Sequence, residues 1–393
     1  MMEPAVSGQP SPRAFLRVAG ASIARHQLGI ALALDCQRIV CLAREMSPDM
    51  IAFQHACEQA GRQFNLVTAA SQLSGLITAS DEIFLFSDGL FADQEGAVRL
   101  LDSARGQVLV QPIEGAQAAG FERIDINRAS AGLARLPGEL VERLRELPAD
   151  YDTVSALVRI ALQSGLLMTE VPAHLRSPSS WRLVHNEHEA LEIEGEWLRT
   201  NTQSNGTGLV GQAIGRWASL TFGASLLHAG NASNVLSISI LVDCIAAFLL
   251  GWLGLAWAGF LCAGAGAVMV DMHRRLRAAE RRSLGESKPA VARADVLGWL
   301  LDAVLAGLCL WATPRLQDED LLSWIFAPAM LFLLLNLLVR QIDVRHASWL
   351  EDRVLLSVLL AGAVLFGQVD GLVQFAGLGL VGLALLMPRR CRS

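Results

Sequence analysis

Residues 235–270, VLSISILVDCIAAFLLGWLGLAWAGFLCAGAGAVMV, contain two long apolar runs and one charged side chain, that of Asp243. A helix needs roughly 17 to 20 apolar residues to cross a hydrocarbon core about 30 Å thick. The stretch therefore predicts two membrane-spanning helices joined by a short turn. It makes the second half of the chain a membrane domain.

Four more apolar runs follow. The six runs together cover residues 235–252, 254–270, 296–312, 321–339, 354–368 and 372–387. The fifth is short for a span, but each has close to the minimum length. We expect an all-α domain of six transmembrane helices over residues 235–388.

Arginines are distributed unevenly around these runs. They gather between the second and third runs, between the fourth and fifth, and in the tail at 389–393, whereas the segment TPRLQDED (313–320) is acidic. Basic loops stay on the cytoplasmic side of a membrane. We expect a bacterial inner-membrane protein whose N- and C-termini are both cytoplasmic, and we expect no cleavable signal at the N-terminus.

The composition excludes several functions. An apolar content of 52% and a mean hydropathy of +0.39 are too high for a purely soluble chain of 393 residues. The net charge of −6 argues against a general nucleic-acid binder, so no nucleic-acid partner is expected. Lys288 is the one lysine, which excludes lysine-dependent chemistry in the residues before it. The seven cysteines contain no C-x-x-C pair and indicate neither a disulfide scaffold nor a zinc site.

Residues 14–200 alternate helical and strand patterns, which predicts a cytoplasmic layered α/β domain. Short apolar runs at 38–43, 64–69, 82–88 and 107–112 have the pattern of buried parallel strands. Helices are expected at 47–61, 93–105, 136–147 and 152–165. Residues 1–13 are expected to be disordered, 201–212 to form a linker, and 213–230 to form a helix in the membrane interface.

Aspartates at the membrane are the first candidates for chemistry, because a carboxylate in a span normally has a partner. Asp271 ends the second run and Asp302 lies about two turns into the third, so both could reach one divalent cation. Carboxylate oxygens are ligands that Mg²⁺ and Mn²⁺ prefer. The alternative is that Asp271 begins an exposed loop and Asp302 hydrogen-bonds a neighbouring helix.

Six spans, an aspartate followed by a basic run, and the G-x-x-x-D of Gly298 and Asp302 resemble the CDP-alcohol phosphatidyltransferase family. Its signature is D-x-x-D-G-x-x-A-R followed by G-x-x-x-D-x-x-x-D. The resemblance implies weak Mg²⁺ or Mn²⁺ binding by the two aspartates and a CDP-alcohol substrate. This chain has Arg274 at the second aspartate position and Ala306 at the last, where the family's base stands. The nucleotide-binding residues implied in this half are Arg274, Arg275, Arg277 and Gly298.

The first half is similar to the nucleotidyltransferase domains fused to some members of that family. Their glycine-rich loop, L-x-A-G-x-G-x-R, corresponds to LRVAGASIAR (16–25), with Gly20 in place, Ser22 at the second glycine and Arg25 displaced by one position. The resemblance implies a nucleotide site at these three residues. It also implies a metal-binding role for Asp88, although Ser-Asp-Gly is an ordinary turn as well.

These features favour a membrane protein that resembles CDP-alcohol phosphotransferases of polar-lipid headgroup synthesis, with weak or lost catalysis. The alternative is a non-catalytic partner or regulator of an active paralogue. The expected partners are the lipid bilayer, a CDP-alcohol, and a second copy or a paralogue.

His185 and His188 in HNEH have the spacing of a metal-binding pair, but a solvated surface pair fits as well. The run HRRLRAAERR (273–282) fits either an anionic headgroup or a topology signal.

Overall fold

The computed structural model describes residues 12–146, 152–177, 179–201, 211, 213–215, 217–218, 221, 232–284, 292–313, 321–341, 350 and 352–386. Most of the expected disordered N-terminus, most of the linker at 201–212 and the basic tail at 389–393 lie outside these ranges. The interfacial helix expected at 213–230 lies partly outside them, and its described residues are helical.

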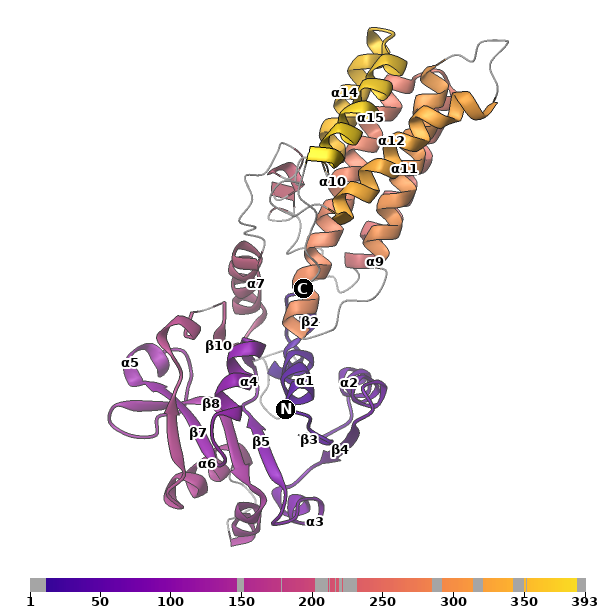
Figure 1. Ribbon diagram of the computed structural model, residues 1–393. Helices are drawn as coiled ribbons and strands as arrows, with labels where there is room; N and C mark the ends of the chain where they lie inside the picture. The colour runs from indigo at the N-terminus through magenta and orange to yellow at the C-terminus, as the bar shows by residue number, and fades with distance from the viewer. Residues whose placement is uncertain are drawn as a thin grey trace. The chain divides into compact units, whose positions relative to one another are not determined.

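The chain divides into two compact units. One contains residues 1–200 and 279–287, and the other contains 201–278 and 288–393. The first is an α/β unit with small sheets and the second is helical (Figure 1). This confirms the two fold classes expected from the sequence.

The four expected strands are present as β3 (Arg38–Leu42), β4 (Gln63–Val67), β5 (Glu82–Phe86) and β7 (Gln107–Pro112). β3 and β4 form a parallel pair. β5 and β7, however, both pair antiparallel with a strand that the pattern did not reveal, β8 (Arg128–Pro137). The sheet order is β5-β8-β7-β9, with β9 (Leu167–Glu170) parallel to β7. The expectation of purely parallel strands is therefore wrong for this sheet.

The helix expected at 136–147 is also wrong in part. Leu136 and Pro137 end β8, and a 3-10 helix, η3, covers Gly138–Glu146. The backbone explains why β8 ends before Gly138. The Gly138 N–H donates to the Asp81 carbonyl at 2.7 Å, and a Cβ on Gly138 would collide with the Thr78 carbonyl. The apolar spacing of this stretch instead places Leu140, Val141 and Leu144 in the core against α6.

The other expected helices of this unit are α2 (Pro48–Gln59), α4 (Gln94–Asp102) and α6 (Thr153–Gln163). Ser47, Asp93 and Asp152 cap their N-termini by accepting a backbone N–H. The remaining elements are η1 (Arg13–Phe15), β1 (Arg17–Val18), β2 (Ala21–Ser22), α1 (Ile23–Ala33), η2 (Ala70–Gln72), α3 (Leu73–Leu76), β6 (Leu90–Ala92), α5 (Ile113–Ala116), η4 (Ala173–Leu175), β10 (Trp181–Leu183) and α7 (Glu187–Asn201).

In the helical unit, each of the six apolar runs forms a helix. These are α9 (Ala232–Trp252), α10 (Ala256–Leu284), α11 (Arg293–Ala312), α12 (Leu321–Gln341), α14 (Arg353–Leu365) and α15 (Val369–Leu386). They run alongside one another (Figure 1) and bury one shared apolar core, which includes Ile240, Phe260 and Leu305. Their outer surfaces carry many exposed large apolar side chains.

Three helices in the described part of the chain are long and apolar enough to cross a membrane. They are Asn234–Trp252, Arg293–Ala312 and Val369–Leu386. Shorter apolar helices in this unit cover Trp324–Val339 and Arg353–Leu365. A protein with three such segments and an apolar exterior belongs in a membrane.

Candidate functional site

A buried ion pair inside the helical unit joins Asp302 on α11 to Arg353 on α14. Arg353 Nε donates to Asp302 Oδ1 at 2.7 Å, and Nη2 donates to Oδ2 at 3.1 Å. Asn336 on α12 donates to the same Oδ2 at 2.7 Å. Asp302 is only 5% exposed. Both oxygens of this buried carboxylate therefore accept hydrogen bonds, and a guanidinium neutralises its charge.

Arg353 is itself held in place. Its Nη1 donates to the Leu350 carbonyl at 2.6 Å, and its own carbonyl accepts from the Ser357 hydroxyl at 2.7 Å. Asp352, just before it, caps α14 by accepting the Leu355 N–H at 3.0 Å. The start of α14 thus fixes the guanidinium that meets Asp302.

Asp271, the second expected metal ligand, contacts a different arginine. Arg275, one turn later on α10, donates to Asp271 Oδ2 at 2.7 Å. Arg274 lies 3.7 Å from the carboxylate of Asp295 on α11, in a half-exposed pair. Three of the residues assigned to metal or nucleotide binding are thus engaged in ion pairs along α10 and α11.

Gly298 and Arg277 are the other two residues of this unit that were assigned to nucleotide binding. Gly298 faces Arg274, whose Nη2 would stand 3.6 Å from a Cβ at this position. Arg277 also has a polar or electrostatic partner within the molecule. The structure therefore gathers Arg274, Asp295 and Gly298 at one end of the helical unit.

These contacts make a divalent metal a poor fit at Asp302. A cation on Asp302 would compete with the guanidinium of Arg353, because each oxygen of this carboxylate already accepts a hydrogen bond. Within the described ranges, no group of three or more His, Cys, Asp or Glu side chains is arranged to hold a metal. The donor set of Asp302 does not suit a metal in this arrangement, and the shared Mg²⁺ or Mn²⁺ site stays a prediction.

Asp243, in the middle of α9, has a thiol for a partner. Cys262 on α10 donates to Asp243 Oδ1 at 3.2 Å. The other carboxylate oxygen is buried against Gly266, where a Cβ would collide with it. Gly266 therefore makes room for this intramembrane carboxyl.

The expected glycine-rich loop of the α/β unit is a tight hairpin. β1 and β2 pair antiparallel, with Val18 opposite Ala21, so Ala19 and Gly20 alone form the turn. Both have positive φ, 55° and 83°, as a type I′ turn requires. Ser22 then caps α1, because its hydroxyl accepts the Arg25 N–H at 3.3 Å. The serine at the family's second glycine position thus starts a helix directly after the turn.

Asp88 lies in a turn of the same unit that contacts α1. Gln27 on α1 donates to the carbonyls of Ser87 and Leu90, at 3.0 Å each, and so holds α1 against the turn that carries Asp88. Both Asp88 and Arg25 have interactions within the molecule. The structure therefore brings the predicted nucleotide residues and Asp88 to one part of the α/β unit.

Glu194 on α7, which the sequence interpretation missed, faces the turn of Ala19 and Gly20. Its side chain is fully buried, and neither oxygen accepts a hydrogen bond from the described residues. Burial raises the pKa of this carboxyl to about 8, and the nearby backbone N–H of Gly20 opposes that rise. An unpaired buried acid beside a strained turn is unusual in a folded protein.

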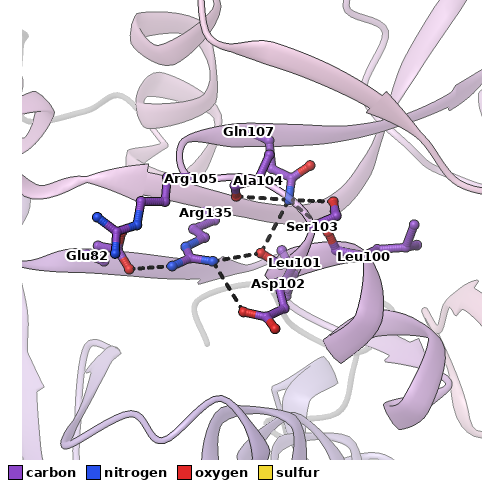
Figure 2. Close-up of polar contacts among 9 residues, drawn as sticks. All are labelled: Glu82, Leu100, Leu101, Asp102, Ser103, Ala104, Arg105, Gln107 and Arg135. Atoms are coloured by element: carbon purple, nitrogen blue, oxygen red, sulfur yellow. Dashed lines mark hydrogen bonds and ion pairs between the residues drawn. The ribbon is translucent and has the colours of Figure 1, made fainter.

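A second polar cluster closes the C-terminal end of α4 (Figure 2). Arg135 on β8 donates to Glu82 at 2.6 Å and to the Leu101 carbonyl at 3.1 Å, and its guanidinium lies 5.4 Å from the centre of the Phe84 ring. A cavity of about 230 Å³ lies beside it, lined by Glu82, Arg105, Gly106, Arg135, Leu136, Pro137 and Leu166.

Gln107 completes this cluster from β7 (Figure 2). It is fully buried, its Nε2 donates to the Leu100 carbonyl at 2.7 Å, and its Oε1 accepts the Thr169 hydroxyl at 2.6 Å. Gln107 Nε2 thus donates to carbonyls at the end of α4, where Leu100 also accepts from the Ser103 N–H and hydroxyl. The cluster therefore has a structural role as a helix cap.

The HNEH stretch is the start of α7. Asn186 accepts the Glu189 N–H at 2.8 Å, and Glu189 accepts the His185 N–H at 2.9 Å and contacts the His185 ring at 3.1 Å. His188 is 83% exposed and lies 3.5 Å from Glu192. The two histidines thus face different glutamates, and the stretch works as a capping arrangement.

No family model matches this sequence, and no curated protein matches it. The functional assignment therefore depends on the residues and contacts described above.

Three residues at these sites escaped the sequence interpretation: Arg353, Asn336 and Glu194. Asn336 stands alone in an apolar run, which is a usable signal for a buried hydrogen bond. Arg353 stands at the edge of the fifth run, where the distribution of arginines indicates only topology. Nothing in the pattern of α7 distinguishes Glu194 from its exposed acidic neighbours.

Proposed function

We propose that the protein is a membrane-embedded, non-catalytic relative of CDP-alcohol phosphotransferases that acts as a partner or regulator of an active paralogue. On this proposal the helical unit derives from such an enzyme, and arginines take the place of the cations at its carboxylates. The α/β unit would derive from a nucleotidyltransferase whose glycine-rich loop has shortened to a two-residue turn.

The observation that carries this proposal is the contact between Asp302 and Arg353. In a metal-dependent phosphotransferase, divalent cations bind the carboxylates and stabilise the charge that develops on the phosphate. Here the guanidinium already neutralises Asp302, and Asp271 is paired with Arg275. Ala306 carries no group that could accept a proton from an acceptor hydroxyl. Positioning of substrate, charge stabilisation and base catalysis would all be weak.

We further propose that all six helices span a bacterial inner membrane, with the α/β unit and both termini in the cytoplasm. The match between six apolar runs and six helices supports this number, and the arginine-rich loops support the orientation. Labelling of single added cysteines from outside the cell tests it. We expect labelling of Gln317→Cys and none of Arg281→Cys, and the reverse pattern would invert the orientation.

The competing proposal is an active enzyme of polar-lipid headgroup synthesis. In it Asp271 and Asp302 share Mg²⁺ or Mn²⁺, and Arg274, Arg275 and Arg277 bind the pyrophosphate of a CDP-alcohol. Substrate binding would have to break the contact between Asp302 and Arg353 before any metal could enter. The two proposals therefore differ in metal dependence and in turnover.

A paired measurement on the purified full chain separates them. The melting temperature is recorded with CDP and with Mg²⁺ or Mn²⁺, and CMP release is followed with a panel of CDP-alcohols. We expect stabilisation by CDP through the arginines, little effect of metal, and no CMP release above the background of Asp302→Ala. Metal-dependent CMP release that disappears in Asp302→Ala would overturn the non-catalytic proposal.

A further inference from the structure

The segment before the first long helix of the helical unit has two different faces. Its described residues, at 211, 213–215, 217, 218 and 221, are helical. Gly211, Gly215 and Ala218 are spaced four and three residues apart, so they lie on one face. Ile214, Trp217 and Thr221 are spaced three and four apart and lie on another.

The small-residue face is pressed against carboxylates of the helical unit. The Gly211 N–H donates to Asp352 Oδ2 at 3.0 Å in a buried hydrogen bond. Gly215 approaches Asp271 so closely that a Cβ would collide with its carboxylate. Ala218 is buried, at 8% exposure. Asp352 is the N-cap of α14 and Asp271 lies in the middle of α10, so this face fixes the segment across both helices.

The large-residue face is exposed. Trp217 is 62% exposed and Ile214 is 40% exposed. A soluble helix would turn these side chains inward and its glycines outward, which is the opposite of this arrangement. Tryptophan concentrates at the headgroup level of bilayers because its ring is apolar and its N–H is polar. The start of α9 also exposes apolar side chains, among them Val235 and Ile238.

We propose that Ile214 and Trp217 insert into the headgroup region of one bilayer leaflet. The hydrogen bond of Gly211 to Asp352 and the contact of Gly215 with Asp271 hold the segment at that depth. The partner of this surface is the lipid bilayer, recognised through apolar burial and independent of lipid charge. The inference rests on the membrane embedding of the helical unit proposed above.

The test uses the full-length protein in phosphatidylcholine nanodiscs. A cysteine at Trp217→Cys carries an environment-sensitive fluorophore, and nitroxide lipids quench it either near the headgroup or near the end of the acyl chain. The signal of the parent chain labelled in the same way is subtracted. We expect blue-shifted emission and quenching several-fold stronger with the headgroup nitroxide than with the deep one.

Two further positions separate this inference from the embedding itself. Leu359→Cys on α14, 51% exposed, should be quenched by the deep nitroxide, and Ile126→Cys in the α/β unit, 79% exposed, by neither. Quenching at 359 without quenching at 217 would overturn the interfacial helix and leave the embedding intact. Absence of quenching at both would overturn the embedding and with it the inference.

A substitution on the other face tests the anchoring. Gly215→Ala should move the label at 217 and reduce the headgroup quenching, because the added methyl meets the Asp271 carboxylate. Gly307→Ala is the matched control, since a Cβ at that helical glycine of the same unit meets nothing within 4 Å. Equal quenching in both variants would show that the glycine contact does not position the segment.

Discussion

The carboxylate of Asp302 accepts two hydrogen bonds from the guanidinium of Arg353, at 2.7 and 3.1 Å, inside the apolar core of the helical unit. The contact ties α11, which is long enough to span a membrane, to α14, which is a shorter apolar helix. It also occupies the oxygens that a metal-dependent enzyme would offer to a cation.

Replacing Arg353 by Gln should destabilise the protein strongly, because it leaves Asp302 charged and buried without its partner. Breaking a buried ion pair from one side costs about 3–5 kcal/mol. Unfolding of the full chain in detergent, followed by tryptophan fluorescence, measures this. Joint replacement Asp302→Leu and Arg353→Met should recover most of the loss, since an apolar pair replaces a buried ion pair at little cost.

The control for this experiment is Arg99→Gln. Arg99 pairs with Glu95 at 2.6 Å, but both side chains are largely exposed, at 71% and 83%. An exposed pair contributes about 0–1 kcal/mol. A loss for Arg353→Gln no larger than for Arg99→Gln would mean that water reaches the Asp302 carboxylate.

Glu194→Gln should change how stability depends on pH. The folded pKa of Glu194 is raised from 4.5 to about 8, so the folded state holds a proton that the unfolded state releases. The contribution of Glu194 to the free energy of unfolding is fully present below pH 4.5 and is lost as the pH rises to about 8. The loss is about 5 kcal/mol at most, because each pKa unit between 4.5 and about 8 corresponds to 1.36 kcal/mol.

We therefore expect Glu194→Gln to unfold like the parent chain near pH 5 and to be more stable than the parent at pH 8. Melting temperatures of the full chain across this range measure the effect. Glu187→Gln, an exposed change on the same helix, should leave the profile unaltered. Parallel profiles for the parent and Glu194→Gln would mean that the carboxyl is not buried in solution.

Ser22→Ala should cost about 1 kcal/mol, because α1 loses the hydroxyl that accepts the Arg25 N–H. Ser22→Asp should keep the cap and the stability. Ser22→Gly, which restores the residue of the nucleotidyltransferase loop, should cost only a few tenths of a kcal/mol. It should add no thermal stabilisation by nucleotides, since the turn still has two residues. Nucleotide stabilisation gained in Ser22→Gly would contradict this account of the turn.

Gln107→Leu should destabilise the α/β unit, although leucine has a similar size. The change removes the side-chain donor to the Ala104 carbonyl (Figure 2) and the acceptor of the Thr169 hydroxyl. An unsatisfied buried polar group costs about 1–3 kcal/mol. Denaturant unfolding of the full chain measures the loss, and the exposed Gln63→Leu on β4 is the control. Equal effects of the two changes would contradict the capping role.

Local patterns were sufficient for most of the elements. Each apolar run formed a helix, and the short runs at 38–43 and 82–88 formed strands. The failure at 136–147 has a local explanation too, because its amphipathic spacing fits a buried 3-10 helix as well as an α-helix. β8 was missed because Arg128–Pro137 is rich in small residues and lacks the continuous apolar run of a buried strand.

The sequence by itself determined that the second part of this chain consists of apolar helices and that most of its charges lie between the apolar runs. The length of an apolar run and the positions of its charges are properties of the local sequence. They can therefore be predicted without knowing which residues pack together. The tertiary structure decided which charge meets which. Asp302 carries the same sequence signal whether its partner is a metal ion or a guanidinium, and Arg353 reaches it only through the packing of α14 on α11. Ser22 likewise caps α1 because the hairpin before it has a turn of only two residues, which is too short for a glycine-rich loop.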